Sequence, residues 1–246
     1  MLDWQIGKIV DIQQATNATR RFFIELPNTS KFDFEPGQFV TLDLPIHEQK
    51  NKRWRSYSIA SSPNGGNIIE LVIVLMVGGA GTTYLFNETK IGAELTIRGP
   101  QGKFTLPQEI ENDLFLICTG TGIAPFRSMI HHIKNNFIAA KNIYLVFGSR
   151  TIEDCLYKDE MLELQTIMPN LKYIPCLSRE NESQDWYKKG YVHQAYKDVI
   201  NDNKINNQIT PANFYLCGWK NMVDEAKQTI LGLGYDKKDI HLELYG

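Results

Sequence analysis

The spacing of apolar residues changes near residue 112, and this change constrains the fold more than any other feature of the sequence. Up to residue 106, six short apolar runs are separated by turns rich in Gly, Pro and Asn. After residue 112, strand-like runs alternate with segments whose apolar residues recur at helical spacing. Short strands in series predict an antiparallel barrel or sandwich, and the alternation predicts a parallel sheet with helices on both faces. We therefore expect two domains, 1–106 and 112–246, with a linker around Pro107.

The elements that this pattern predicts can be placed by residue number. In the first half, strands are expected at 7–10, 22–26, 38–42, 57–60, 68–77 and 94–97. In the second half, strands at 114–118, 143–147, 173–177, 214–217 and 240–245 alternate with helices around 126–133, 153–167, 191–200 and 221–231. A chain of 246 residues is long enough for two domains that each bury a core.

Charge and cysteine content exclude several classes of protein. The 26 Lys and Arg residues nearly balance 28 Asp and Glu, which argues against a broad basic face for nucleic acid. The four cysteines stand singly, at 118, 155, 176 and 217, so no disulfide framework, zinc site or iron–sulfur cluster is predicted. The longest apolar run, 68–77, is too short to cross a bilayer, and no secretory signal is visible. We expect a cytoplasmic monomer.

The first loop of the second half combines glycines with a helix start. Gly120 and Gly122 lie between a predicted strand and a predicted helix, and Thr121 stands between them. Glycine lets the backbone approach a ligand closely, and the N–H groups of a helix start bind phosphate. Pro125 occupies the third Gly position of GxGxxG. A phosphate loop and a tight turn are therefore equally open readings.

Two further loops after predicted strands carry polar groups. Ser178, Arg179 and Lys189 would suit a 2′-phosphate, and Tyr191 could stack on adenine, although a solvated basic loop is the alternative. Cys217 and Gly218 end another strand. A single cysteine at such a place is more often a small core residue than a reactive thiol.

Two segments of the first half also carry candidate ligands. Arg55–Ser58 mixes a cation, an aromatic ring and hydroxyls, and with Lys50, Lys52 and Arg53 it could form a basic edge. Gly78–Leu85 is a Gly-rich loop that runs into a possible short helix. Its N–H groups and the hydroxyls of Thr82 and Thr83 could hold phosphate.

Taken in order, these pieces resemble the ferredoxin–NADP reductase family of flavoproteins. The similarity covers nearly the whole chain, and five motifs occur in the family's order although each is weak alone. They are RxYS at Arg55–Ser58, the flavin-pyrophosphate loop at Gly79–Thr83, GPxGxF at Gly99–Phe104, GTGIAP within Thr119–Pro125 and YxCG at Tyr215–Gly218.

The resemblance implies a six-stranded antiparallel β-barrel that binds FAD, followed by an α/β domain that binds NADP(H). Tyr57 would lie on the isoalloxazine ring and Ser58 near its reactive N5 atom. The flavin pyrophosphate would lie among Arg55, Gly81, Thr82 and Thr83. The nicotinamide nucleotide would contact Thr121, Gly122 and Gly218, Cys217 would sit beside the reacting ring, and Ser178, Arg179, Lys189 and Tyr191 would bind the adenosine 2′-phosphate end.

The C-terminal residues are similar to the family's Glu-Val-Tyr ending, with Gly246 as a departure. By this resemblance Tyr245 would cover the flavin, and Glu243 would act as an acid or proton relay near Ser58. The alternative for both residues is an ordinary last strand.

The resemblance implies an FAD-dependent oxidoreductase that exchanges hydride with NADP(H) and single electrons with a separate ferredoxin or flavodoxin. Because such carriers are generally acidic, Lys50, Lys52 and Arg53 are candidates for docking them. The alternatives are an NADH-dependent reductase component of an oxygenase system and a non-catalytic flavin-binding regulatory subunit. A nucleic-acid adaptor is disfavoured because the basic run is short.

Overall fold

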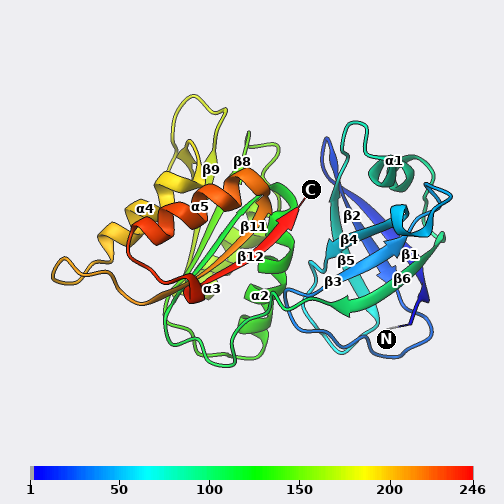
Figure 1. Cartoon of the computed structure of the whole chain (residues 1–246), viewed down its shortest axis with the longest axis horizontal. Helices are drawn as coiled ribbons and strands as arrows, with labels where there is room; N and C mark the ends of the chain where they lie inside the picture. The colour runs from blue at the N-terminus through cyan, green and yellow to red at the C-terminus, as the bar shows by residue number, and fades with distance from the viewer. Residues whose placement is uncertain (1–2, 246) are drawn as a thin grey trace. The chain divides into compact units, whose positions relative to one another are not determined.

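The computed structural model describes residues 3–245, so Gly246, the departure noted at the C-terminus, lies outside the described residues. Contacts divide the chain into two compact units (Figure 1). The first contains the residues up to Leu106 together with Ala124–His132. The second contains Pro107–Ile123 and the residues from Ile133 onward. Helix α2 (Ile123–Asn135) therefore contributes to both units.

The first unit is built on a six-stranded antiparallel sheet in the order β4-β3-β6-β1-β2-β5. The two end strands meet just after β4, where Ile59 bridges Leu71 and the Ala60 N–H donates to the Glu70 carbonyl at 2.8 Å. The six predicted strands and their barrel arrangement are thus confirmed. The strands are β1 (Gln5–Thr16), β2 (Thr19–Glu25), β3 (Phe39–Asp43), β4 (Trp54–Ser58), β5 (Ile68–Val74) and β6 (Glu94–Gln101).

Alternate residues of these strands point inward and form the barrel core. Phe22 and Ile24 of β2, and Val40 and Leu42 of β3, are buried, as the period of two along a strand requires. Helix α1 (Ala80–Asn87) follows β5 and buries Leu85 against the same core. The short 3-10 helix Lys50–Lys52 precedes β4 and buries none of its residues.

The strand expected at 94–97 is longer in the structure than the sequence predicts. β6 continues to Gln101, which pairs with Phe39, and the register shifts between this pair and Thr41–Arg98. Such an irregularity accommodates Pro100, which has no N–H to donate to the ladder. The strand expected at 68–77 ends earlier, at Val74, and the next three residues are exposed.

The second unit is a six-stranded parallel sheet in the order β10-β9-β8-β7-β11-β12. Helices α4 and α5 pack on one face around Phe115, Val146 and Leu216, and Figure 1 shows them in front of the sheet. The strands are β7 (Asp113–Thr119), β8 (Ile143–Ser149), β9 (Leu171–Leu177), β10 (Lys188–Lys189), β11 (Ala212–Trp219) and β12 (Ile240–Tyr245). The helices, besides α2, are α3 (Lys158–Ile167), α4 (Val192–Asp202) and α5 (Lys220–Gly232).

Two local expectations for this unit are corrected. The helix expected from residue 153 begins at Lys158, because Tyr157 before it adopts a left-handed conformation with φ 55° that ends regular structure. The two-residue strand β10 was not expected, since Lys188 and Lys189 are exposed and carry no apolar signal. Among residues 3–245, no helix is both long and apolar enough to cross a bilayer.

The strand order creates a switch point between β7 and β11. The chain runs from β7 to β8, β9 and β10 on one side, and then returns to β11 on the other side of β7. In open parallel sheets, ligands bind at the carboxyl ends of the strands on either side of such a point. The loops after β7 and β11 are therefore where a nucleotide site is expected.

Candidate active site

The turn after β7 packs closely against the end of β11, and only glycine leaves room for this contact. A Cβ atom on Gly122 would lie 2.5 Å from the Cys217 carbonyl oxygen. A Cβ atom on Gly218, whose φ is +145°, would lie 2.7 Å from the Thr119 hydroxyl. Both glycines named from the sequence are therefore required by the switch point itself.

The turn between β7 and α2 offers unsatisfied polar groups to a ligand. The Thr119 Oγ1 atom is buried and has no hydrogen-bond partner within residues 3–245. A buried polar atom without a partner is costly, so a ligand group that paired with it would bind favourably. Thr121 is half-buried in the 3-10 turn Gly120–Gly122 that precedes helix α2. These features fit a nicotinamide nucleotide at this edge.

Cys217 lies in β11 beside Glu243 of β12, with which it is in register. Its thiol is completely buried and lies 3.9 Å from the Glu243 Oε1 atom. Burial, and to a lesser degree the Glu243 carboxylate, raise the pKa of the Cys217 thiol well above its ordinary value, while a hydrogen bond with Tyr245 works in the opposite direction. Cys217 is therefore an uncharged thiol at neutral pH.

The buried thiols predict how stability depends on pH. Burial also raises the pKa of Cys118 well above its ordinary value. Above pH ~8.5 an unfolded thiol loses its proton while the folded thiol keeps it, so the free energy of unfolding must fall as pH rises. We expect a fall of up to about 1.4 kcal/mol per pH unit per thiol between pH ~8.5 and 10. Urea unfolding across this range measures it.

The matched control for this pH dependence is the double variant Cys118→Ala/Cys217→Ala, in which the slope should become shallower without vanishing, because burial also raises the pKa values of Cys155 and Cys176. An unchanged slope in the variant would show that other groups cause the loss of stability.

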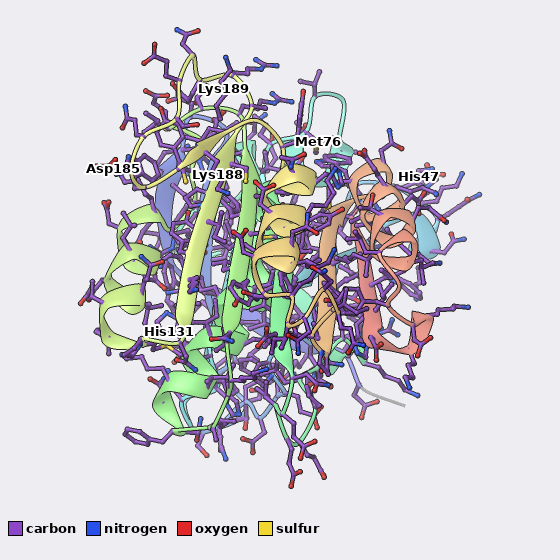
Figure 2. The ribbon with its side chains drawn as sticks, turned by 90° about the vertical axis from the view of Figure 1, so that its left-hand side faces the viewer. His47, Met76, His131, Asp185, Lys188 and Lys189 are labelled. Carbon is purple, nitrogen blue, oxygen red and sulfur yellow. The ribbon has the colours of Figure 1, made fainter. Side chains whose placement is uncertain are left out.

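The residues named for a 2′-phosphate gather at the carboxyl end of β9. Lys189 in β10 is in register with Leu177, the residue before Ser178, and the Gly190 N–H donates to the Leu177 carbonyl at 2.9 Å. Figure 2 labels Lys188 and Lys189 toward the upper end of this sheet. Arg179 and Lys189 are exposed, and the Lys189 ammonium donates to the Asn181 carbonyl at 2.8 Å. The structure thus brings Ser178, Arg179 and Lys189 together.

Tyr191 follows this group at the N-cap of α4. Its side chain is 73% exposed, which is unusual for a ring of this size and leaves a face open for stacking. Sequence reasoning missed one neighbour, Arg150, whose carbonyl accepts the Arg179 N–H at 2.8 Å and which is exposed. Its signal was available, because Arg150 follows β8 as Arg179 follows β9, and the two strands are adjacent.

In the first unit, Arg55 lies over the start of helix α1. A Cβ atom on Gly81 would lie 2.9 Å from the Arg55 Cγ atom, so this glycine makes room for the arginine. The N-cap residue of α1, Gly79, makes no side-chain capping hydrogen bond. A guanidinium group beside uncapped N–H groups matches the chemistry of a diphosphate. This cradle fits the pyrophosphate of a flavin dinucleotide.

The two threonines of this loop have different environments. The Thr82 hydroxyl accepts from the Met76 N–H and donates to the Gly79 carbonyl, both at 3.1 Å, so it closes the loop before α1. Thr83, by contrast, is exposed. The structure therefore leaves the Thr83 hydroxyl better placed for a ligand, and gives Thr82 a part in shaping the loop.

The other two residues of the RxYS motif differ in burial. Tyr57 is half-buried in β4, and burial raises the pKa of its hydroxyl to about 12, against a smaller opposing effect of the Arg55 charge. Ser58 is the buried last residue of β4, in register with Phe39. Arg55, Tyr57 and Ser58 form one group in the first unit, whereas Cys217, Glu243 and Tyr245 form another in the second.

Comparisons with known proteins agree with this division. A model of the oxidoreductase FAD-binding domain matches residues 7–106, and one of the oxidoreductase NAD-binding domain matches residues 116–228. The two halves of the chain are therefore an FAD-binding and a nicotinamide-nucleotide-binding domain.

Within residues 3–245, no group of three or more His, Cys, Asp or Glu side chains is arranged to hold a metal ion.

Full-length relatives are similar across almost the whole chain. The chain is 31% identical over 240 residues to "Ferredoxin--NADP reductase B" of Sorangium cellulosum, covering 97% of this chain and 96% of that protein. It is 32% identical over 245 residues to "Phenol hydroxylase P5 protein" of Acinetobacter pittii, covering 99% of this chain but 65% of that protein. The first relative thus has nearly the same extent, and the second is longer.

A solved structure has the same fold from end to end. The crystal structure of a ferredoxin NADP+ reductase from Neisseria gonorrhoeae with bound FAD and NADP has a TM-score of 0.81. It is 24% identical in sequence, and the match covers 98% of both chains.

Proposed function

The chain belongs to the ferredoxin–NADP reductase family of flavoprotein oxidoreductases, and from this premise we propose that it moves hydride between NADPH and FAD and exchanges single electrons with a separate ferredoxin or flavodoxin. FAD, when bound, supplies the conversion between two-electron and one-electron chemistry. The protein supplies binding sites, orientation and electrostatics for both nucleotides.

The observation that carries the choice of NADPH is the cationic group after β9. Arg179 and Lys189 provide two positive charges at one end of two paired strands, beside Ser178, whose hydroxyl donates to the Ser149 carbonyl at 3.3 Å. A 2′-phosphate is bound by cations and hydroxyls, whereas a free 2′-hydroxyl is usually bound by a carboxylate. Glu180, the acidic neighbour, accepts the Ile152 N–H at 3.0 Å. This contact holds its carboxylate in the loop, so Glu180 is a weaker candidate for binding a ribose 2′-hydroxyl.

The chain's own residues divide the remaining tasks. Gly122 and Gly218 have no Cβ atom, so a flat ring could approach the backbone at the switch point, and the unpartnered Thr119 hydroxyl would pair with a polar group of the nicotinamide. The Cys217 thiol would lie beside that ring in its protonated, uncharged form. A positively charged nicotinamide would therefore not be stabilised by a thiolate at this position. Glu243, 3.9 Å from the Cys217 sulfur, holds or releases a proton at its Oε1 atom.

In the first unit, Arg55, which lies against Gly81 at the start of α1, would pair with the flavin diphosphate, and the Tyr57 ring would pack on the isoalloxazine. The Tyr57 hydroxyl stays protonated, since burial raises its pKa to about 12. Ser58, the buried last residue of β4, would offer its hydroxyl to the reacting edge of the flavin.

A second candidate function is a reductase component of an oxygenase system. It is favoured by the 32% identity to "Phenol hydroxylase P5 protein". The carrier would then be another protein of that system. NADH rather than NADPH would be the donor under this alternative.

Parallel titrations of the purified flavoprotein test these readings. The flavin absorbance is followed after anaerobic addition of NADPH or NADH, and then during transfer to an acidic ferredoxin or flavodoxin. We expect NADPH to bleach the flavin at least tenfold more efficiently, because the cationic group recognises its extra phosphate. Equal efficiency with NADH would favour the oxygenase reading, and absence of bleaching by either would favour a regulatory subunit.

The contacts of Arg53 favour Lys50 and Lys52 over Arg53 as docking residues for an acidic carrier. Arg53 is paired with Asp43 at 2.7 Å and donates to the Leu44 carbonyl at 3.2 Å, so it is a structural residue of the turn before β4. Lys50 and Lys52 are exposed on the short 3-10 helix. We propose that these two lysines dock the carrier.

Charge reversal of the two lysines predicts a salt-dependent loss. In Lys50→Glu/Lys52→Glu, we expect carrier reduction to slow by about tenfold at low ionic strength and by less than twofold at about 0.5 M salt. Stopped-flow carrier reduction measures this rate. Flavin bleaching by NADPH should be unchanged.

The control is Lys8→Glu/Lys90→Glu, which changes the net charge equally at two other exposed positions of the first unit. If both double variants slow carrier reduction to the same extent, the effect is one of net charge and the patch is misplaced.

A further inference from the structure

A buried ion cluster that the proposed function does not use lies in the first unit. The Glu70 side chain on β5 is 4% exposed, and both of its oxygens accept hydrogen bonds from arginine. Arg21 donates from Nε to Oε1 at 2.6 Å and from Nη2 to Oε2 at 3.1 Å. Arg127 donates from Nη1 to Oε2 at 2.9 Å. Burying three charged groups is unfavourable unless they are well paired and hydrogen-bonded. A buried cluster of this kind therefore suggests a role beyond stability.

The two arginines come from different parts of the unit. Arg21 lies in β2, the strand that pairs with β5, so it belongs to the barrel wall that also carries Glu70. Arg127 lies in helix α2, within the segment Ala124–His132 that packs with the barrel. Arg127 therefore links helix α2 to the paired strands β2 and β5, whereas Arg21 belongs to those strands.

Arg127 and its neighbour also hold the backbone that follows β4. Arg127 Nη1 donates to the Ala60 carbonyl at 2.9 Å, and the Ser128 hydroxyl donates to the Ser61 carbonyl at 2.7 Å. The Ser61 hydroxyl in turn accepts the Glu70 N–H at 3.0 Å. Two successive carbonyls, two and three residues after Ser58, are thus fixed by one helix.

That helix begins where the nucleotide turn ends. The Gly120–Gly122 turn leads directly into Ile123, the first residue of α2, and Arg127 follows one helical turn later. The planar guanidinium group lets Arg127 donate to the Glu70 carboxylate and the Ala60 carbonyl together. A lysine ammonium, on its flexible chain, would hold the two acceptors in a less fixed geometry.

We propose that Arg127, oriented by Glu70, is a positioning residue for hydride transfer. Arg127 holds the Ala60 carbonyl and its neighbour Ser128 holds the Ser61 carbonyl, so together they fix the backbone that directly follows Tyr57 and Ser58. The inference rests on the proposed function, because it concerns the alignment of the same reaction. Small misalignments of reacting groups slow a reaction strongly even when binding is preserved.

The cluster offers its own matched control. In Arg127→Met, Glu70 keeps Arg21 as its partner, and in Arg21→Met it keeps Arg127. Neither variant leaves the buried carboxylate without a cation, and methionine fills similar space with an apolar chain. Arg21 also donates to Gln13 of β1 at 3.2 Å and lies over the Phe23 ring of its own strand, 5.2 Å from the ring centroid.

Three quantities are measured on both variants: the flavin bleaching rate at saturating NADPH, the Kd for NADP+, and amide exchange of the α2 peptide in the FAD-free and FAD-bound protein. For Arg127→Met we expect bleaching to slow by about tenfold or more, a Kd within about twofold of wild type, and faster exchange in α2. For Arg21→Met we expect bleaching and α2 exchange to stay near wild type.

Equal slowing in the two variants would show that the cluster acts through stability alone, and unchanged bleaching in Arg127→Met would also overturn the inference. If wild-type protein is not bleached by NADPH or NADH, the proposed function fails and the positioning role with it. A bleached wild type with indistinguishable variants rejects the positioning role alone.

Discussion

Replacing Gly122 with alanine should lower kcat/KM for NADPH by about 100-fold or more while FAD remains bound. The added Cβ would lie 2.5 Å from the Cys217 carbonyl oxygen and 2.9 Å from its carbon. Both are backbone atoms of a central strand, so the loop after β7 has to move away from β11. Moving it displaces the start of α2 and the Thr119 hydroxyl, but it leaves Arg55 and the α1 loop of the other unit untouched.

Diaphorase kinetics with NADPH measure the loss, and flavin content per protein measures FAD retention. Gly232→Ala is the matched control, because a Cβ there meets no heavy atom within 4 Å and its backbone is helical. Gly218→Ala should be as damaging as Gly122→Ala, since φ +145° adds backbone strain to the 2.7 Å contact with Thr119. Near-normal kcat/KM in Gly122→Ala would mean that the nucleotide does not use this switch point.

Removing the two cations after β9 should abolish the preference for NADPH. In Arg179→Ala/Lys189→Ala we expect kcat/KM for NADPH to fall by about 100-fold or more, because each charge-assisted hydrogen bond to phosphate is worth about 1.5–3 kcal/mol. The value for NADH should change by less than about threefold, since NADH has no 2′-phosphate. Steady-state assays with both nucleotides measure the ratio.

The neighbouring lysine provides the control. Successive side chains of a strand point to opposite faces, and the Lys188 ammonium donates to Asp198 Oδ2 at 3.3 Å. Lys188→Ala should therefore leave both kcat/KM values near wild type. A parallel loss with NADPH and NADH in the double variant would indicate damage to the loop rather than loss of phosphate recognition.

The architecture could be predicted from the sequence because its signals are local. Short alternating runs such as Phe22–Leu26 and turn residues between them mark the barrel strands, and the wholly apolar run Leu114–Cys118 marks a strand buried on both faces. The errors fall where a long-range pairing overrides the local signal. Pro100 lies inside β6 because Phe39 pairs with Gln101, and no local pattern contains that information.

The candidate site was predictable for the same reason, since its glycines and cations stand in short motifs after strands. The burial and the hydrogen-bond partners of each side chain could not be predicted from the sequence. The sequence does not show that Cys217 is fully buried beside Glu243, or that the Thr82 hydroxyl closes its own loop. Nor does it show that Glu70 and Arg127, 57 positions apart, share a hydrogen bond. Such contacts arise only when the elements are packed.

The shared helix α2 bears on how such modules can be exchanged. A recombination junction at Pro107 would look natural from the sequence, yet it would separate Glu70 from Arg127 and Ser61 from Ser128. A barrel transplanted without residues 124–132 would keep the Arg21–Glu70 pair but would lose the hydrogen bonds that Arg127 and Ser128 donate to Glu70, Ala60 and Ser61. Functional chimeras should therefore inherit β5 and the first turns of α2 from the same parent, even though they are well separated in the sequence.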